Sequence, residues 1–277
     1  MISTFPMLNI PDYARKPEVA VALITMLVAV VGMGTLLGMH RVPMLSTDAA
    51  TGEVYEVALP DFASINDVDE KKTQFFDFFE EYIERENQRL LERREQLLVY
   101  NEILDSSWRL TFSERRALIK LAEEFGIETA EVSGRELMDK LLLRVDTIPV
   151  SLALAQAANE SAWGTSRFAQ EGNNYFGQWC YSQGCGIVPE RRRSDATHEV
   201  QKFISIEQAV QAYFYNINSH ERYSHFRQMR AQMRQRGRID PVALASGLGA
   251  YSERGDNYID ELQTIIRQNQ LQSRDAG

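Results

Sequence analysis

The sequence contains little cysteine and little histidine. Only two cysteines and four histidines occur among its 277 residues, and they do not recur at the paired spacing of a zinc site. No metal and no cofactor are therefore expected. Basic residues are also outnumbered, with 30 lysines and arginines against 39 acids. Because binding to a phosphate backbone needs clustered basic side chains, no nucleic-acid partner is expected either.

The two cysteines, Cys180 and Cys185, are separated by only four residues. A disulfide between them fits an oxidising compartment, whereas a metal site would need a second pair of cysteine or histidine ligands. On the loop-entropy model so small a ring contributes about 2 kcal/mol. Its main effect is therefore expected to be local, in fixing one loop.

The longest apolar run covers residues 19–39 and carries no charged side chain. It is long enough to cross the hydrocarbon core of a lipid bilayer as a helix. We interpret it as an uncleaved anchor, because the small-residue cleavage site of a signal peptide does not follow it. Arg15 and Lys16 precede the run and only Arg41 closely follows it. This asymmetry places the N-terminus in the cytoplasm and the rest of the chain outside.

Two glycines in this run, Gly34 and Gly38, have the spacing that lets two membrane helices approach closely. A homodimer through this pair is one interpretation. Glycine is also frequent in membrane helices in general, so the spacing alone does not decide it.

The remaining chain divides by composition and periodicity. A stretch with Pro43, Gly52 and Pro60 keeps no sustained period, which is typical of a tether. Residues 68–104 then give a long amphipathic helical pattern without a heptad, which favours packing on the same domain over a coiled coil. The predicted parts are a cytoplasmic tail (1–18), a transmembrane anchor (19–39), a tether (40–67), a helical region (68–132), a main domain (133–271) and a tail (272–277).

Local signals place the shorter elements. Two capping pairs, Thr111 with Glu114 and Ser133 with Glu136, begin two predicted helices, residues 112–125 and 134–145.

Pro149 suits the first turn of a third helix that ends near Trp163. Residues 175–204 are rich in glycine, cysteine, proline and charge and end in a β-prone segment, which predicts a small irregular β lobe. Helices resume at Ser205 and continue, with a break at residues 237–240, to about Leu271. The predicted fold class is mainly α with a small β lobe (α+β).

One acid, Glu160, lies in the segment "QAANESAWGTSRF" at the end of the third predicted helix, with Gly164 as its cap. The negative end of the helix dipole and the indole of Trp163 both disfavour a carboxylate there. The pKa of Glu160 should therefore rise toward that of a general acid. A solvated glutamate beside a core tryptophan is the alternative.

The segment "ANESAWGTSRFAQEGNNYFGQW" resembles the glucosaminidase domain of glycoside hydrolase family 73, the mannosyl-glycoprotein endo-beta-N-acetylglucosaminidase-like domain. "NYFGQWCYSQGCGIVPERR" and "YSERGDNYIDELQTIIRQN" are similar to the bacterial Bax-type proteins of that superfamily. The resemblance covers roughly residues 137–270. The positions that match the family motif are Glu160, Ser161, Gly164, Ser166, Asn174, Phe176 and Gly177.

This resemblance implies a lysozyme-like catalytic domain, with a helical lobe and a β lobe around a sugar-binding cleft, behind the single membrane helix. It implies hydrolysis of β-1,4 bonds next to N-acetylglucosamine, with peptidoglycan glycan strands as substrate. It also places the chain in the bacterial inner membrane, with the catalytic domain facing the periplasm.

The resemblance assigns roles to individual residues. Glu160 would protonate the glycosidic oxygen, and Glu190 falls where the family has its second glutamate. Glu199, on the predicted strand, is the alternative second carboxylate, and the substrate's own N-acetyl group is another. Tyr251 would position that group or a water, although "YSERGDNY" has one residue more than the family pattern and no proline. The predicted substrate-binding residues are Trp163, Asn174, Phe176, Trp179 and Tyr258.

Two other functions stay open. A lytic transglycosylase would form an anhydro sugar without a second carboxylate, although the residues after Glu160 differ from the Gly-Leu-Met-Gln type typical of such enzymes. A catalytically silent wall-binding scaffold would use the anchor and the long charged helix to hold partners.

Overall fold

The helix α2 (Val68–Asp105) is the longest element of the computed structural model, and it begins where Asp67 accepts a hydrogen bond from the Glu70 N–H at 2.8 Å. The structure describes residues 44–47, 54–57, 59–106, 109–130, 132–190, 192 and 196–275. The predicted tail (1–18) and anchor (19–39), with Gly34 and Gly38, lie outside these residues. Among the residues described, no helix is both long enough and apolar enough to cross a membrane.

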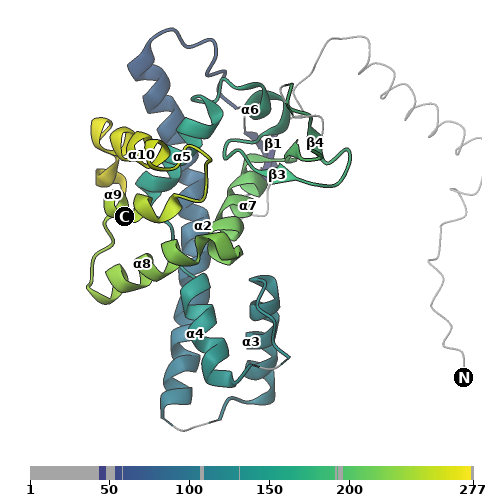
Figure 1. The fold of residues 1–277 in the computed structure, drawn as a ribbon, viewed down its shortest axis with the longest axis vertical. Coiled ribbons are helices and arrows are strands. Elements are labelled where there is room, and N and C mark those ends of the chain that lie inside the picture. Colours follow the sequence, from purple (N-terminus) through teal and green to yellow (C-terminus); the bar gives the residue numbers. More distant parts are fainter. Residues whose placement is uncertain are drawn as a thin grey trace, which may run out of the picture. The chain divides into compact units, whose positions relative to one another are not determined.

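One side of α2 is buried against the helices of the main domain. It contacts α4 (Gly134–Arg144), α5 (Val150–Ser161) and α7 (Ile206–Ser219), and Figure 1 shows α4 beside its C-terminal part. The fully or nearly fully buried apolar side chains of α2 are Phe75, Phe76, Phe79, Ile83, Leu90 and Leu97. The prediction that this helix packs on its own domain is confirmed.

The two predicted caps begin helices as expected. Thr111 begins α3 (Phe112–Glu124) with a complete capping box, in which the Thr111 hydroxyl accepts from the Glu114 N–H and the Glu114 carboxylate accepts from the Thr111 N–H. The Ser133 hydroxyl caps α4 by accepting from the Glu136 N–H at 3.2 Å. Both helices end one residue before the predicted boundary.

The β lobe is a three-stranded antiparallel sheet made of β3 (Trp179–Cys180), β4 (Gly186–Ile187) and β5 (Glu199–Gln201). Its order is β3-β5-β4, so the last strand in sequence is the central one. A mainly helical fold with a small β lobe is therefore confirmed. The short helix α6 (Arg167–Gly172) leads into this lobe and contacts β4.

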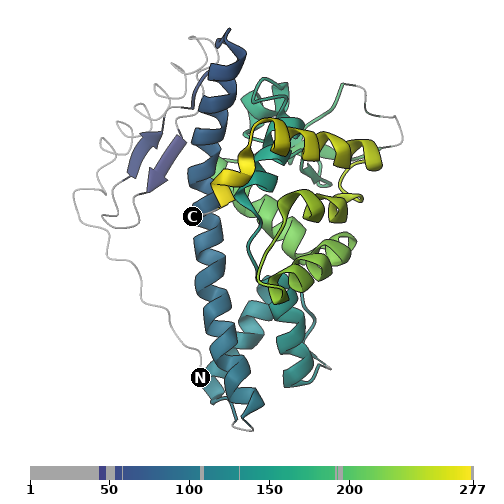
Figure 2. The same cartoon turned by 90° about the vertical axis from the view of Figure 1, so that its left-hand side faces the viewer.

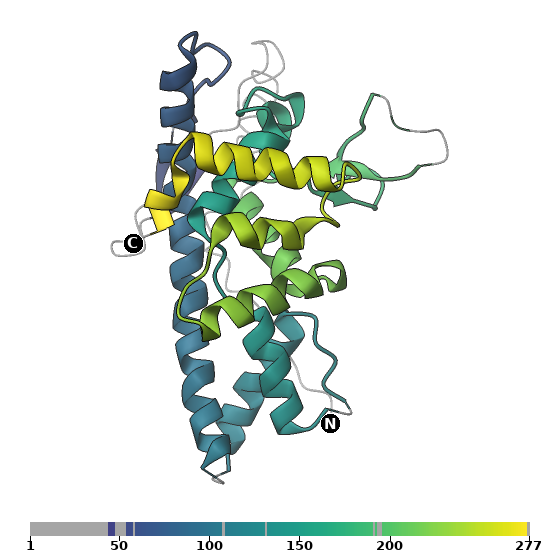
Figure 3. The same ribbon diagram turned by 60° about the vertical axis from the view of Figure 1, so that its left-hand side comes forward.

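The C-terminal part is helical and supports α5. Figures 2 and 3 show α8, α9 and α10 on one side of α2, and α10 and η4 both contact α5. These elements are η2 (Glu221–Tyr223), α8 (Ser224–Gln235), α9 (Pro241–Leu244), η3 (Ala245–Leu248), α10 (Asp256–Gln268) and η4 (Leu271–Asp275).

A buried ion cluster joins α8 to the loop that precedes α5. Asp146 is 1% exposed and accepts hydrogen bonds from Arg234 at 2.9 and 2.5 Å. Burial alone would raise the pKa of Asp146, but Arg230, Arg94 and Arg234 together hold it below its ordinary value. The start of α5 is thereby tied to both α2 and α8.

The predicted tether, residues 40–67, needs correction. β1 (Met44–Thr47) and β2 (Val54–Val57) pair antiparallel, with Met44 opposite Val57. Phe62 is 2% exposed and packs on Phe75 of α2, with ring centroids 5.2 Å apart. The segment that reaches α2 is therefore part of the folded unit.

The predicted tail, residues 272–277, is also wrong in its described part. Residues 271–275 form η4, and Asp275 accepts hydrogen bonds from the Ser151 N–H at 2.9 Å and the Ser151 hydroxyl at 2.6 Å. Asp275 thus satisfies a backbone donor at the start of α5, which is the usual role of a capping carboxylate. The contact spans 124 residues, and local sequence patterns do not report it.

Candidate active site

The helix α5 carries Glu160 in its last turn and is buried along nearly its whole length. It ends at Ser161 and is capped by Ala162, whose φ of 50° is left-handed, and Trp163 and Gly164 also have positive φ. The predicted cap at Gly164 is therefore two residues late. Gly164 serves a different purpose, because a Cβ there would lie 2.4 Å from the Phe62 ring. Only glycine allows that close approach.

A chain of buried polar groups leads to Glu160 from two other helices. The Tyr213 hydroxyl of α7 donates to Gln156 Oε1 at 2.6 Å, and Gln156 Nε2 donates to the Tyr258 hydroxyl of α10 at 3.0 Å. Tyr258 in turn hydrogen-bonds to the Glu160 carboxylate. Since the two tyrosines and Gln156 are each 0% exposed, this network fixes the side chain that faces Glu160.

Glu160 itself has the character of a proton donor. Burial raises its pKa, and this outweighs the opposing effects of the Tyr258 hydrogen bond and the Arg254 charge. Its Oε1 atom is buried and has no hydrogen-bond partner among the residues that the structure describes. A carboxyl oxygen in such a place favours the protonated form, which is the form that a general acid needs.

Gly177 connects Glu160 to an open groove. Its φ is +64°, and a Cβ at this position would lie 2.9 Å from Glu160 Oε2. The same glycine lines a groove of about 590 Å³ between the β lobe and α7. Aromatic side chains that line this groove are Phe176, Trp179, Tyr181, Tyr215, Tyr223 and Tyr251.

The predicted positioning residue Tyr251 lies at this groove. Its hydroxyl donates to the Phe176 carbonyl at 2.6 Å, and its ring stacks on Tyr258 with centroids 5.7 Å apart. Burial raises the pKa of Tyr251 well above its ordinary value, so its proton stays in place. In this geometry Tyr251 fixes the backbone next to Gly177.

The two candidates for a second carboxylate have opposite surroundings. The Glu190 side chain is 81% exposed and lies 3.7 Å from Arg167. Glu199 is 5% exposed, and its two oxygens accept from the N–H groups of Gly184 at 3.0 Å and Gly186 at 2.8 Å. These bonds lower the pKa of Glu199. Glu199 therefore holds a loop, while Glu190 is free to meet solvent.

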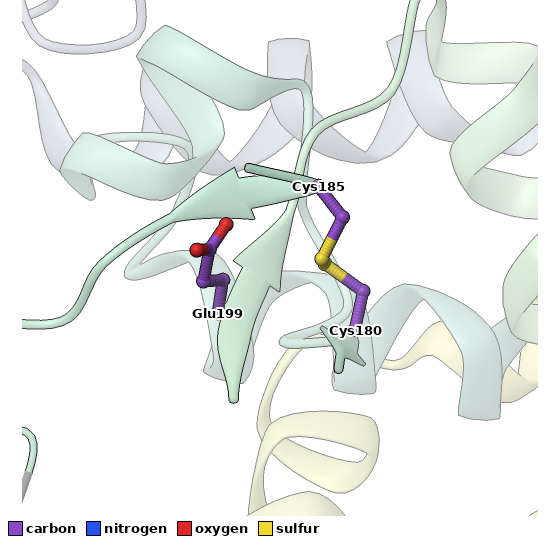
Figure 4. Close-up of side chains that lie close together, drawn as sticks. All are labelled: Cys180, Cys185 and Glu199. Carbon is purple, nitrogen blue, oxygen red and sulfur yellow. A yellow bond between two sulfur atoms is a disulfide. The ribbon is translucent and has the colours of Figure 1, made fainter. Parts of the chain in front are cut away.

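That loop contains the predicted disulfide, and Figure 4 shows Glu199 beside it. Cys180 and Cys185 are joined, as expected from their spacing. Their sulfurs and a Glu199 oxygen lie within 4.8 Å of one another, which is the one group within the described ranges with metal-ligand proximity. Because the sulfurs are bonded and both Glu199 oxygens hold backbone donors, the three residues do not fit a metal.

Four of the five predicted substrate-binding residues pack inside the domain, and Trp163 and Asn174 are two of these four. The Trp163 ring lies against Phe75 and Phe76 of α2, at 5.8 and 5.3 Å between centroids. Asn174 is 1% exposed and donates to the carbonyls of Gln178 and Gln201 at 2.8 and 2.9 Å.

The other three predicted substrate-binding residues are Phe176, Tyr258 and Trp179. Phe176 is 1% exposed and stacks on Tyr213 at 4.2 Å between centroids. Tyr258 belongs to the polar chain behind Glu160, while Trp179 is 51% exposed. The structure thus brings Glu160, Tyr258, Tyr251 and Phe176 together around Gly177.

Sequence reasoning did not assign Gln156 and Tyr213 to the site. Gln156 is the one amide within residues 150–158, an otherwise small and largely apolar stretch, and it lies one helical turn before Glu160. Such a lone amide on a buried face needs partners, and that signal was available. Tyr213 offered no local signal, because its contact with Gln156 spans 57 residues.

A larger pocket of about 840 Å³ lies between α2 and residues 147–150. It contains none of the predicted site residues. Arg234 and Arg274, which line it, are paired with Asp146 and Asp77. The chemistry therefore points to the smaller groove.

A family model and two known proteins are similar to this chain. A family model described as glucosaminidase, mannosyl-glycoprotein endo-beta-N-acetylglucosaminidase, matches residues 136–271. Protein bax of Escherichia coli (strain K12) is 30% identical over 214 residues, which are 77% of this chain and 75% of that protein. The catalytic domain of the autolysin Auto from Listeria monocytogenes matches at a TM-score of 0.42 and 14% identity, over 79% of this chain and 100% of that one. A score at this level does not establish a shared fold.

Proposed function

The chain belongs to the glucosaminidase family, and from this premise we propose that it is a peptidoglycan hydrolase that cleaves β-1,4 bonds next to N-acetylglucosamine. Glu160 is the general acid. The observation that carries the proposal is the state of its carboxyl group, which has a raised pKa and a buried Oε1 without a partner among the described residues. The groove lined by Gly177 is where the glycan strand binds.

The reaction begins with proton transfer from Glu160 to the oxygen of the glycosidic bond. As that bond breaks, its electron pair stays on the departing oxygen, and the remaining sugar becomes oxocarbenium-like. Tyr258 keeps the carboxyl group in one orientation, while the Tyr251 bond to the Phe176 carbonyl holds the Gly177 backbone against it. Such pre-set positioning lowers the barrier, because little reorganisation is needed during the reaction.

For the second group we propose Glu190, which would deprotonate or orient the attacking water. Its exposure supports this role over Glu199, whose oxygens both hold backbone donors. Replacing each by glutamine tests the assignment, with digestion rate as the readout. We expect Glu190→Gln to lose more activity than Glu199→Gln. Wild-type activity in Glu190→Gln would remove it from the mechanism and favour the substrate's own N-acetyl group.

The test of the proposed function is release of soluble fragments from purified peptidoglycan by the full chain, wild type beside Glu160→Gln. General acid catalysis contributes about 10² to 10⁴ in rate, so the variant should lose activity by a factor in that range. Mass spectrometry of the products should show reducing N-acetylglucosamine ends. Anhydro-muramic ends would instead establish a transglycosylase. Wall binding without digestion by either protein would establish a scaffold.

For location, we propose that residues 19–39 anchor the chain in the bacterial inner membrane, with the catalytic domain in the periplasm. The support is the uncharged length of this run and the basic residues Arg15 and Lys16 before it. A reporter that functions only in the periplasm should be active when fused after residue 277. Activity only when it is fused before residue 1 would reverse the orientation.

A further inference from the structure

Three aromatic side chains that line the groove are exposed, namely Trp179 at 51%, Tyr181 at 71% and Tyr215 at 49%, and Trp179 is the one of these three that stacks on another ring among the described residues. Phe176 and Tyr223 on the same groove are nearly fully buried. One face of its indole is covered by His198, at 4.0 Å between ring centroids and 9° between ring planes. Trp179 is therefore a supported ring whose opposite face is not covered by this stack.

The backbone around Trp179 is held by three independent restraints. Trp179 pairs with Val200 in the sheet, and the next residue, Cys180, is joined to Cys185. Glu199 holds the connecting loop through the N–H groups of Gly184 and Gly186, beside the disulfide shown in Figure 4. The backbone that carries the indole is thus held before any ligand binds, which reduces the ordering cost of binding.

His198 is held in the same way. Its carbonyl accepts a hydrogen bond from Arg192 at 3.0 Å, and its successor Glu199 begins the central strand β5. These contacts restrain the backbone that carries the imidazole, and the ring itself is held against the indole by the stack. Offset and parallel aromatic pairs of this kind are worth about 0.5 to 1.5 kcal/mol beyond the area they bury.

Trp179 is also close to Glu160. Trp179 follows Gly177 by two residues, which limits the distance between their Cα atoms to about 7 Å. Gly177 lies directly against Glu160 Oε2. A sugar ring on the indole is therefore next to the bond that Glu160 protonates.

We infer that Trp179 is a stacking platform for one N-acetylhexosamine ring of the glycan strand, and that His198 is the positioning residue behind it. This inference rests on the proposed function, because it takes the groove to be the glycan site. The apolar C–H face of a pyranose lies flat on the open face of the indole, while its hydroxyl groups remain in water. A rigid, half-exposed aromatic ring in a polar groove suits such an amphipathic ligand.

Binding without turnover separates this inference from catalysis. The full chain with Glu160→Gln is titrated with the tetramer of N-acetylglucosamine, and tryptophan fluorescence and the indole N–H resonances are recorded. Three tryptophans are present, so the Trp179 resonance is assigned by its loss in Trp179→Ala. We expect the sugar to shift this resonance, and Trp179→Ala to raise Kd at least about tenfold, which is about 1.4 kcal/mol.

The His198 variants test the positioning role. His198→Ala should raise Kd about three- to tenfold, the range that corresponds to the energy of an aromatic pair. His198→Phe, which keeps a flat ring under the indole, should restore Kd to within about twofold of the parent value. In the active enzyme His198→Ala should raise KM and leave kcat nearly unchanged, because the platform contributes uniform binding.

The Trp179 variant and the His198 variants test two separate parts of this inference. An unchanged Kd in a folded Trp179→Ala variant would overturn the platform, and an unchanged Kd in His198→Ala, or a failure of His198→Phe to rescue, would overturn the role of His198. Folding is monitored by the thermal midpoint and by the resonances of the other tryptophans. Sugar binding at Trp179 by a wild-type chain that digests no peptidoglycan would contradict the hydrolase proposal and leave the platform standing.

Discussion

The helix α5 and the β lobe each carry one largely buried carboxylate, and the pKa values of the two are shifted in opposite directions. On α5, Glu160 has a buried oxygen without a partner among the described residues, and burial raises its pKa. On β5, Glu199 has both oxygens bonded to backbone N–H groups, and these bonds lower its pKa. Enclosure therefore does not by itself make a proton donor. The hydrogen-bond donors around a buried carboxylate decide whether it can donate a proton or serves to hold a loop in place.

The largest effect is expected from a change that moves the Glu160 carboxyl group without removing it. Gly177→Ala places a Cβ 2.9 Å from Oε2, so either the carboxylate or the loop must shift. We expect a loss of digestion rate of at least about tenfold, equal to about 1.4 kcal/mol in the barrier. Misplacement of a catalytic group by a small distance is sufficient for such a loss.

The matched control for that change is Gly237→Ala. Gly237 also has a positive φ, of +77°, but its Cβ would meet nothing within 4 Å. Both variants carry the strain of a left-handed residue, about 1 to 2 kcal/mol. Equal activity of the two variants would show that Gly177 matters only through backbone strain.

Replacing Glu199 should change the stability of the protein more than its digestion rate. Glu199→Gln replaces one acceptor by a donor that faces a backbone N–H, so the thermal midpoint at neutral pH should fall. Because the folded-state pKa of Glu199 is lowered, its contribution is present above the ordinary glutamate pKa and is lost as pH falls through the folded-state value. The difference between wild type and variant should therefore shrink in acid. A pH-independent difference would contradict this account.

Glu160→Gln should change stability in the opposite direction. The pKa of Glu160 is raised in the folded state, so ionisation destabilises the fold as pH rises through the ordinary glutamate range. The variant has no such charge, and its thermal midpoint at neutral pH should equal or exceed that of wild type. A series of unfolding curves from acid to neutral pH measures this. A fall in midpoint at neutral pH would mean that the Glu160 charge is stabilised in the fold.

The smallest expected effect is that of Tyr258→Phe. The Tyr258 hydrogen bond lowers the pKa of Glu160, so its loss should move the high-pH limb of the rate profile upward. The change also leaves Gln156 Nε2 without its acceptor and should cost about 1 kcal/mol in stability. Profiles of digestion rate against pH for both proteins provide the measurement. A downward shift would show that Tyr258 stabilises the protonated acid instead.

What the sequence predicts well is local. The capping pair Thr111 and Glu114 satisfies backbone donors within one turn, so its pattern is visible in four consecutive residues. The disulfide could be predicted because the sequence has only two cysteines, which allow a single pairing within the chain. The expected direction of the Glu160 pKa was also correct. The cause differed, because burial raises the pKa while the Trp163 ring packs on Phe75 and Phe76.

What the sequence does not predict depends on contacts between distant segments. The role of Glu199 requires the strand pairing that brings Gly184 and Gly186 to it. The place of Trp163 follows from the left-handed residues after α5, which turn the chain toward α2. No local pattern distinguishes such a turn from a helix that simply ends.

The cap that Asp275 forms on α5 lies outside the segment that the family model matches. That model matches residues 136–271, yet Asp275 holds the start of the helix that carries Glu160, and Arg274 binds Asp77 on α2. A recombination event that transferred only residues 136–271 would deliver Glu160 without these supports. The segment that must be inherited together for α5 to keep them is therefore longer than the segment that the family model matches.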